Sequence, residues 1–243
     1  MKNCSHILFF ILQIFIINCV FSQSGEGVET LSLDGDWEVI FDDNDQGILN
    51  KWYTNDNFNI HLSKQTVEVP SALESLIQNY EGVAFYRKQF KVPINWNNQV
   101  VEVHFEAANY KTEVWLNDEV VGFHEGGYTP FRFRIDKLLK VGENNSLVVR
   151  IVTPIILTDK NVDGLGRQEV PMWRGAINGG LWQSVSLVKK NWAQLNDVFL
   201  ETDLLKKAVD FSFEIFNSKI INADASLEIE VFNKDNTKVV SQR

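Results

Sequence analysis

The sequence predicts an all-β protein built on a β-sandwich, and three observations lead to this fold class. Apolar and polar residues alternate with a period of two in short runs such as Val101–Phe105 and Phe131–Ile135, as expected for strands that bury one face. Turn-forming pairs such as Asn117-Asp118 and Gly179-Gly180 separate the runs. Helical patterns are scarce, and many short antiparallel strands with few helices favour a sandwich.

Three runs show the alternation most clearly, and each predicts a strand with one buried face. Their apolar positions are Val101, Val103 and Phe105, then Phe131, Phe133 and Ile135, then Leu147, Val149 and Ile151. In the third run Arg150 occupies an alternate position, on the opposite face. Asn117-Asp118 predicts a two-residue hairpin turn, because both residue types tolerate positive φ. Gly126-Gly127 predicts a bulge or a close backbone approach.

Helix is predicted in one place only. Ser71–Asn79 follows Pro70, and Glu74 lies three residues after Ser71, which is the spacing of a capping box. Asp136–Lys140 is compatible with a single helical turn.

A second domain is predicted to begin near residue 192. Ala208–Asn217 and Ala225–Asn233 again alternate, as in the opening strands of an immunoglobulin-like sandwich. Three or four strands are too few for a seven-strand sandwich, and an unfinished sheet has an open edge. We therefore expect the chain to be a fragment or a truncated reading frame, with domains at residues 23–191 and 192–243.

Residues 1–22 predict a secretory signal peptide. Lys2 precedes an apolar run over residues 7–17, which is short for a membrane span. The alternatives are a membrane anchor and a lipid attached at Cys19. Both cysteines, Cys4 and Cys19, lie in this segment, so the predicted product is periplasmic or secreted, without disulfides and without membrane contact after cleavage.

The net charge of −9 argues against nucleic acid or an anionic membrane as partner. Neutral sugars are compatible with an acidic surface.

Five motifs in order resemble the N-terminal domain of glycoside hydrolase family 2, which includes β-galactosidases, β-glucuronidases and β-mannosidases. They are Leu33–Trp37, Val69–Glu74, Gly82–Val92, Val101–Ile151 and Gly179–Val185. The resemblance implies a jelly-roll-type, galactose-binding-like sandwich followed by an incomplete immunoglobulin-like one, with a carbohydrate as partner. Within these motifs we interpret Trp37, Trp115 and Trp182 as core residues and Arg87 as a paired structural charge.

No catalytic residue is predicted in this chain. Glycosidases of this kind use two carboxylates, which the resemblance places in a third domain, a TIM barrel of about 250 residues. The family's acid/base glutamate follows an asparagine, and no Asn-Glu dipeptide occurs here. The barrel is therefore an expected partner. His61, His104 and His124 lack metal-ligand spacing, so no metal or cofactor is predicted, with calcium at Asp42-Asp43 or Asp159–Asp163 as a minor alternative.

Two regions are candidates for sugar contact, because in family members a loop of this domain reaches the active site. Asn79 lies in one, and the irregular stretch Asp159–Asn178 is the other; long loops are often functional. The candidate substrate-binding residues are Asn79, Arg167, Glu169, Trp173 and Arg174. The alternative for Trp173 is a structural role, in which its side chain packs against the sandwich and holds the loop there. Where some members have a sugar-binding aspartate this chain has Pro171, and Glu169 is a possible substitute.

The sequence thus predicts the non-catalytic N-terminal portion of an exported glycosidase that acts on β-linked carbohydrates. The alternatives are a free-standing carbohydrate-binding module and an inert truncated gene product.

Overall fold

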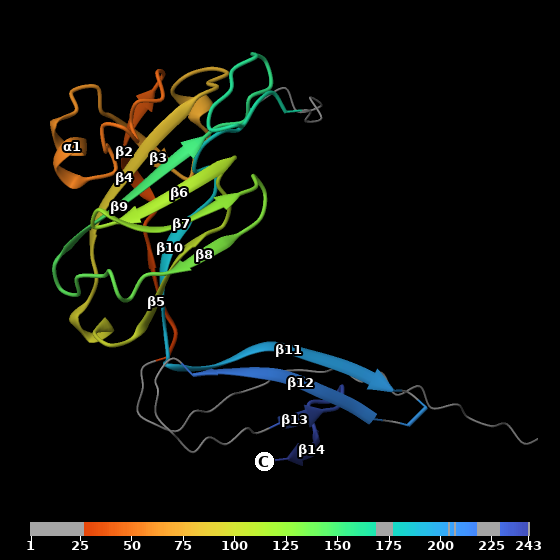
Figure 1. Ribbon diagram of the computed structural model, residues 1–243. Coiled ribbons are helices and arrows are strands. Elements are labelled where there is room, and N and C mark those ends of the chain that lie inside the picture. The colour runs from red at the N-terminus through yellow and green to blue at the C-terminus, as the bar shows by residue number, and fades with distance from the viewer. Residues whose placement is uncertain (1–26, 169–176, 204, 207, 218–228, 243) are drawn as a thin grey trace, which may run out of the picture. The chain divides into compact units, whose positions relative to one another are not determined.

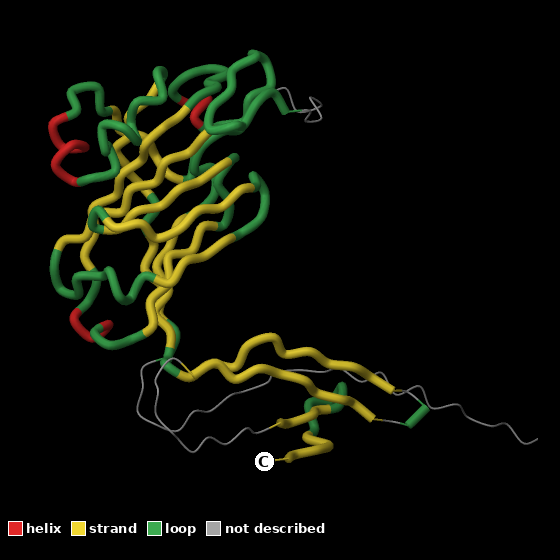
Figure 2. The backbone as a smooth tube through the Cα atoms, in the orientation of Figure 1, coloured by secondary structure: helices red, strands yellow, loops and turns green. Residues whose placement is uncertain are grey.

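The computed structural model describes residues 27–168, 177–203, 205–206, 208–217 and 229–242. They form two compact units, divided between Asn191 and Trp192, which are described separately. Strands dominate the regular secondary structure of both, which confirms the predicted all-β class (Figures 1 and 2). No helix in the described ranges is long and apolar enough to span a membrane.

The first unit contains two antiparallel sheets, of six and four strands. The larger has the order β3-β2-β4-β9-β6-β7, and the smaller has the order β1-β10-β5-β8. Their bounds are β1 Glu29–Ser32, β2 Gly35–Asp42, β3 Gln65–Val69, β4 Val83–Lys91, β5 Val100–Phe105, β6 Lys111–Leu116, β7 Glu119–Glu125, β8 Phe131–Arg134, β9 Asn144–Val152 and β10 Val185–Lys190. Three short helices, α1 Asn55–Ile60, η1 Leu73–Ser75 and η2 Ile94–Trp96, lie in the connections.

The main core of this unit draws residues from both sheets. The predicted apolar positions of β5 and β9 lie in it, and Phe131 and Phe133 of β8 pack against it. Trp37 is 1% exposed and belongs to this core. Period-two alternation therefore identified the buried face of each of these strands correctly.

The other face of β9 is also buried, which corrects the prediction that this strand buries only one face. Val148 and Val152 belong to a second apolar cluster together with Phe58 and Trp115. Even Arg150 is only 1% exposed. The segment 43–64, which contains α1, contributes Trp52, Tyr53 and Phe58 to this cluster and so covers the outer face of the six-stranded sheet.

The predicted hairpin turn joins β6 to β7. Asn117 and Asp118 have φ angles of 52° and 75°, which is the conformation that a two-residue primed turn requires. Gly127 makes the predicted close approach, since a Cβ there would lie 2.3 Å from Oδ1 of Asn109.

The helix predicted over Ser71–Asn79 is wrong, and only the 3₁₀ turn η1 forms there. The hydroxyl of Ser71 donates to the carbonyl of Glu68 instead of capping a helix. The amides of Ser71 and Leu73 donate to the carbonyls of Leu181 and Gly179. Pairing with a distant segment therefore replaces the local helical hydrogen bonds. Residues 136–138 form a turn, closed by the amides of residues 138 and 139 on the carbonyl of residue 135.

The second unit contains two hairpins in its described residues. β11 (Ala193–Asp203) pairs with β12 (Ala208–Asn217), and β13 (Ile229–Phe232) pairs with β14 (Lys238–Gln242). The alternation over residues 209–215 correctly predicted β12. Its apolar side chains remain accessible, since Phe213 is 37% and Ile215 is 52% exposed.

Candidate functional site

The two regions predicted to contact sugar meet at one end of the six-stranded sheet, where its central strand β4 begins and its central strand β9 ends. Glu81, two residues after Asn79, accepts hydrogen bonds from the backbone amides of Ile156 and Leu157 at 2.6 and 2.5 Å. It also accepts from the amide and the hydroxyl of Thr158, at 2.9 and 2.5 Å. One carboxylate therefore fixes the start of the predicted loop against the segment that carries Asn79.

Burial and hydrogen bonding oppose each other at Glu81, which is 3% exposed. Burial by itself raises the pKa of a carboxyl, but hydrogen bonds from Leu157, Thr158 and Ile156 favour the charged form and hold the pKa of Glu81 below its usual value. The ammonium of Lys160 reaches back to the carbonyl of Glu81 at 2.6 Å. Glu81 is therefore a charged anchor at neutral pH.

Thr153 forms a second connection beneath the loop. Its hydroxyl accepts from the amide of Gly82 at 2.9 Å and lies 3.2 Å from the carbonyl of Tyr80. The phenol of Tyr80 is buried and donates to the carbonyl of Val83 at 2.7 Å. Burial is the main reason that the pKa of Tyr80 is raised. The turn after Asn79 is thus closely tied to the end of β9.

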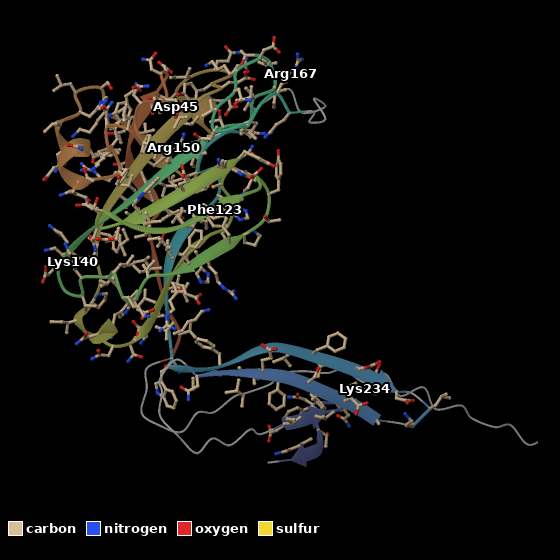
Figure 3. The ribbon with its side chains drawn as sticks, viewed as in Figure 1. Asp45, Phe123, Lys140, Arg150, Arg167 and Lys234 are labelled. Carbon is tan, nitrogen blue, oxygen red and sulfur yellow. The ribbon has the colours of Figure 1, made fainter. Side chains whose placement is uncertain are left out.

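Arg150 holds the middle of the loop. Its guanidinium donates to Asp163 of the loop at 2.6 Å, to Glu113 of β6 at 2.5 Å and to Asp45 at 2.9 Å (Figure 3). Burial lowers the pKa of an arginine, but the carboxylates of Asp163 and Glu113 outweigh burial and raise the pKa of Arg150. The guanidinium therefore stays charged and holds the loop and the segment 43–64 on the same sheet face.

The loop makes its own turn beyond this anchor. Val162 and Leu165 exchange two backbone hydrogen bonds of 3.0 and 2.8 Å around Asp163 and Gly164, and both of these turn residues have positive φ. The amide of Gln168 then donates to the carbonyl of Ile155 at 2.7 Å. The loop therefore doubles back onto its own base before residue 169.

The far end of the loop is tied to the sandwich through Asn109. Its side-chain amide donates to the carbonyls of Ile177 and Asn178 at 3.2 and 3.0 Å. Its backbone exchanges two hydrogen bonds with Gly180. Gly180 has a φ of 104°, and a Cβ there would lie 2.4 Å from the phenol oxygen of Tyr86, so a larger residue does not fit. Both ends of the loop are thus fixed by side chains of the sandwich.

The structure places two of the five predicted site residues. Asn79 is exposed with a φ of 55°. Arg167 is 63% exposed at its side chain, with Asp159 at 3.8 Å, and it extends from the outer end of the loop (Figure 3). Glu169, Trp173 and Arg174, with Pro171, lie outside the described residues and stay predictions. Asn79 and Arg167 belong to the two segments that Glu81 joins.

Sequence reasoning missed the three anchoring residues, Glu81, Arg150 and Asn109. Arg150 had a signal, because it interrupts the apolar run Leu147–Val152, and a charge in such a run is commonly buried and paired. Glu81 and Asn109 had no such signal in the sequence, because their hydrogen-bond partners lie about seventy residues away along the chain.

Other side chains singled out in the sequence have structural contacts. Arg87 donates to Glu38 at 2.8 Å and to Asn59 at 2.7 Å, as interpreted. Trp115 is 5% exposed, whereas Trp182 is half-buried and donates to the carbonyl of Gly127 at 2.9 Å. His104 pairs with Glu102, and His124 stacks on Phe131.

The carboxylates considered for calcium also have protein partners. Asp42 accepts from the amides of Gln46 and Gly47, and Asp163 binds Arg150. The described residues contain no group of three or more side chains arranged to hold a metal ion.

These features define a class of protein, a two-sheet sandwich with an anchored polar loop at the end of its central strands, and loops held by a rigid scaffold often carry function. Residues 30–191 match the glycosyl hydrolases family 2 sugar-binding domain. The chain therefore belongs to glycosyl hydrolase family 2, which confirms the resemblance found in its motifs.

Similar proteins include β-galactosidases and β-glucuronidases that are longer than this chain. A β-galactosidase of Thermoanaerobacter pseudethanolicus is 27% identical over 232 residues, which cover 86% of this chain and 27% of that enzyme. A β-glucuronidase of Bacteroides fragilis is 32% identical over 108 residues, which cover 40% of this chain and 16% of that enzyme. The chain thus spans about a quarter or less of these relatives' length.

Solved structures share the fold. The β-glucuronidase of Lactobacillus rhamnosus has a TM-score of 0.70 at 20% identity, over 91% of this chain and 38% of that one. The Ruminococcus gnavus β-glucuronidase in complex with D-glucuronic acid has a TM-score of 0.69 at 19% identity, over 92% and 39%. At this level of identity the likeness supports the sandwich architecture alone.

Proposed function

We propose that this chain is the non-catalytic N-terminal portion of an exported family 2 glycosidase that acts on β-linked carbohydrates. The observation that carries the proposal is the loop after β9, which Glu81, Arg150 and Asn109 hold at one end of a family 2 sugar-binding domain. The described part of this loop, up to residue 168, is held by these contacts, so Arg167 is presented without a large ordering cost on binding.

In this proposal the loop contributes sugar contacts to an active site that a catalytic barrel completes. The exposed guanidinium of Arg167 offers several hydrogen-bond donors, and the amide of Asn79 offers both a donor and an acceptor. Glu169, Trp173 and Arg174 are proposed to add contacts of the same kind. The two catalytic carboxylates belong to the barrel, so this chain by itself binds but does not hydrolyse.

Export is proposed from residues 1–22, whose basic start and apolar run are typical of a signal peptide. The product is then periplasmic or secreted, and lipid attachment at Cys19 is the alternative. Expression of the full chain with a C-terminal tag tests this, because cleavage after residue 22 gives a defined mass that neither an uncleaved nor a lipid-modified product has.

The binding role is tested by titrating the chain with methyl β-D-galactoside and methyl β-D-glucuronide, monitored by NMR. We expect a Kd of about 1 mM or weaker, because the barrel side of the site is missing. Asn79→Ala and Arg167→Ala should each weaken binding several-fold. Arg167→Ala should leave the thermal midpoint unchanged, whereas Asn79→Ala should lower it slightly, because alanine is strained at the positive φ of this position. Unchanged affinity in both variants contradicts the assigned role of this end of the sheet.

The absence of catalysis is tested with 4-nitrophenyl β-glycosides. The purified chain should release no nitrophenol above the buffer rate. Turnover that copurifies with the chain through successive columns contradicts the proposal.

A further inference from the structure

A hollow lies on the first unit, on the segment 43–64 that covers the six-stranded sheet. It has a volume of about 470 Å³ and is lined by Asn50, Trp52, Asn57 and residues 60–63, and its size is within the range of small-molecule pockets. None of its lining residues belongs to the loop after β9. The function proposed above therefore leaves this hollow unassigned.

The lining combines one aromatic ring with several polar groups. Trp52 is held by edge-on contacts with Phe85, at 5.7 Å between ring centroids, and with His61, at 4.3 Å. Ile60 and Leu62 are 74% and 100% exposed at its rim. A ring held in place beside apolar side chains matches the apolar face of a pyranose.

Several solvent-accessible polar groups of the lining form no hydrogen bond with the described part of the protein. The amide nitrogen of Asn57 donates to the carbonyl of Asn50 at 2.9 Å, and Nδ1 of His61 lies 3.0 Å from the hydroxyl of Ser63. Within the described residues, these contacts leave the amide oxygen of Asn57, the side-chain amide of Asn50 and Nε2 of His61 without protein partners. Such groups can donate to and accept from sugar hydroxyls.

The absence of acidic and basic side chains from the lining favours a neutral ligand over a charged one. No Asp, Glu, Lys or Arg lines the hollow, so no permanently charged side chain of the lining offers an ion-pair partner to a carboxylate or phosphate. The ligand that fits is neutral, with one apolar face and several hydroxyls.

The segment is firmly attached to the sheet, so the hollow does not depend on a ligand to form. Asp42 accepts from the amides of Gln46 and Gly47 at 2.8 and 2.7 Å. A Cβ on Gly47 would lie 2.3 Å from the ring of Phe85. Phe58, which belongs to helix α1, is fully buried, and the guanidinium of Arg87 lies 4.4 Å from the centroid of the Phe58 ring.

We propose that this hollow is an accessory binding site for neutral oligosaccharides, separate from the loop that contains Arg167. Its ligand stacks on Trp52 and forms hydrogen bonds with Asn50, Asn57 and His61. A site of this kind holds the protein on a polymeric or oligomeric substrate without taking part in hydrolysis.

The test is a calorimetric and NMR titration of the chain with cellobiose and lactose, with D-glucuronate as the charged comparison. We expect millimolar binding of at least one neutral disaccharide, at least tenfold weaker binding of glucuronate at this site, and shifts in the indole resonance of Trp52. Asn57→Ala/His61→Ala should weaken disaccharide binding at least fivefold, and Trp52→Phe should weaken it while keeping a ring in the core contact.

The matched control is Ile94→Ala/Asn144→Ala, which alters exposed residues elsewhere on the same unit and should bind as the parent does. The proposal is overturned if neither disaccharide binds at tens of millimolar. It is also overturned if Asn57→Ala/His61→Ala binds the disaccharide as tightly as the parent does. Loss of binding in Asn79→Ala/Arg167→Ala instead would assign the disaccharide site to the loop after β9 and would overturn it too.

Discussion

Two segments cover the outer face of the six-stranded sheet, and they are attached by different interactions. The segment 43–64 rests mainly on apolar side chains, with Phe58 fully buried and Trp52 and Tyr53 packed beside it. The segment 153–168 also contributes Ile155 and Val162 to this cluster, but charged anchors at Glu81 and Arg150 fix its course. The attachment of an apolar segment by packing does not change in strength with pH, whereas attachment through carboxylates weakens when they are protonated.

The comparison also explains why one segment carries a hollow and the other an extended polar loop. Apolar residues beneath the segment 43–64 hold its backbone close to the sheet. Hydrogen bonds to backbone amides, as at Glu81, fix a loop without requiring apolar residues within it. A chain that is anchored in this way is free to carry polar residues suited to sugar contact.

The largest expected effect comes from removing the apolar attachment. Phe58→Ala should lower the free energy of unfolding of the first unit by about 3–5 kcal/mol, because it empties a fully buried ring site. Urea unfolding followed by tryptophan fluorescence measures the change. Ile60→Ala, in the same helix but 74% exposed, should stay within about 0.5 kcal/mol of the parent. Similar losses in both variants would contradict the packing assignment.

Removing the buried cation should have the next largest effect. Arg150→Met leaves Asp45, Glu113 and Asp163 without their shared partner. We expect a loss of about 2–3 kcal/mol, below the usual range for buried pairs because these carboxylates are partly exposed. Arg134→Met breaks an exposed pair with Asp136 and should cost less than about 1 kcal/mol. Equal costs would show that burial of Arg150 is unimportant.

A smaller and pH-dependent effect is expected at Glu81. Glu81→Gln replaces an acceptor of four hydrogen bonds and should cost about 1–3 kcal/mol near neutral pH. The pKa of Glu81 is lowered from 4.5 in the folded chain, so its stabilisation is fully present above that value and is lost as the pH falls through the folded pKa. The gap between parent and variant should therefore narrow in acid.

Hydrogen exchange of the amides of Ile156, Leu157 and Thr158 reports this effect locally. Glu143→Gln, which alters an exposed carboxylate, is the control and should leave those amides protected. A parent–variant gap that stays constant down to pH 3 would contradict the charged-anchor account.

Local sequence patterns predicted the strands well, because side-chain direction in a strand follows from the backbone alone. β5 and β8 bury the predicted faces, and Asn117-Asp118 forms the predicted turn. The pattern failed where a distant segment intervenes. The second face of β9 is buried by the segment 43–64, and the helix predicted from Ser71 gives way to pairing with residues 179–181.

The candidate site was predictable only in part for the same reason. Motif order located Asn79 and the loop that contains Arg167, since these depend on residue types along the chain. The anchors Glu81 and Asn109 act on residues about seventy positions away. No local pattern contains that information, which appears only when the chain is folded.

The most direct test of the central claim is the affinity of the Glu81→Gln variant for methyl β-D-galactoside and methyl β-D-glucuronide. If Glu81 holds a sugar-contacting loop in place, the variant should bind the better of the two ligands several-fold more weakly than the parent at pH 7, with the rest of the sandwich still folded by NMR. Equal affinity of the two proteins, with the amides of residues 156–158 deprotected in the variant, would contradict the claim.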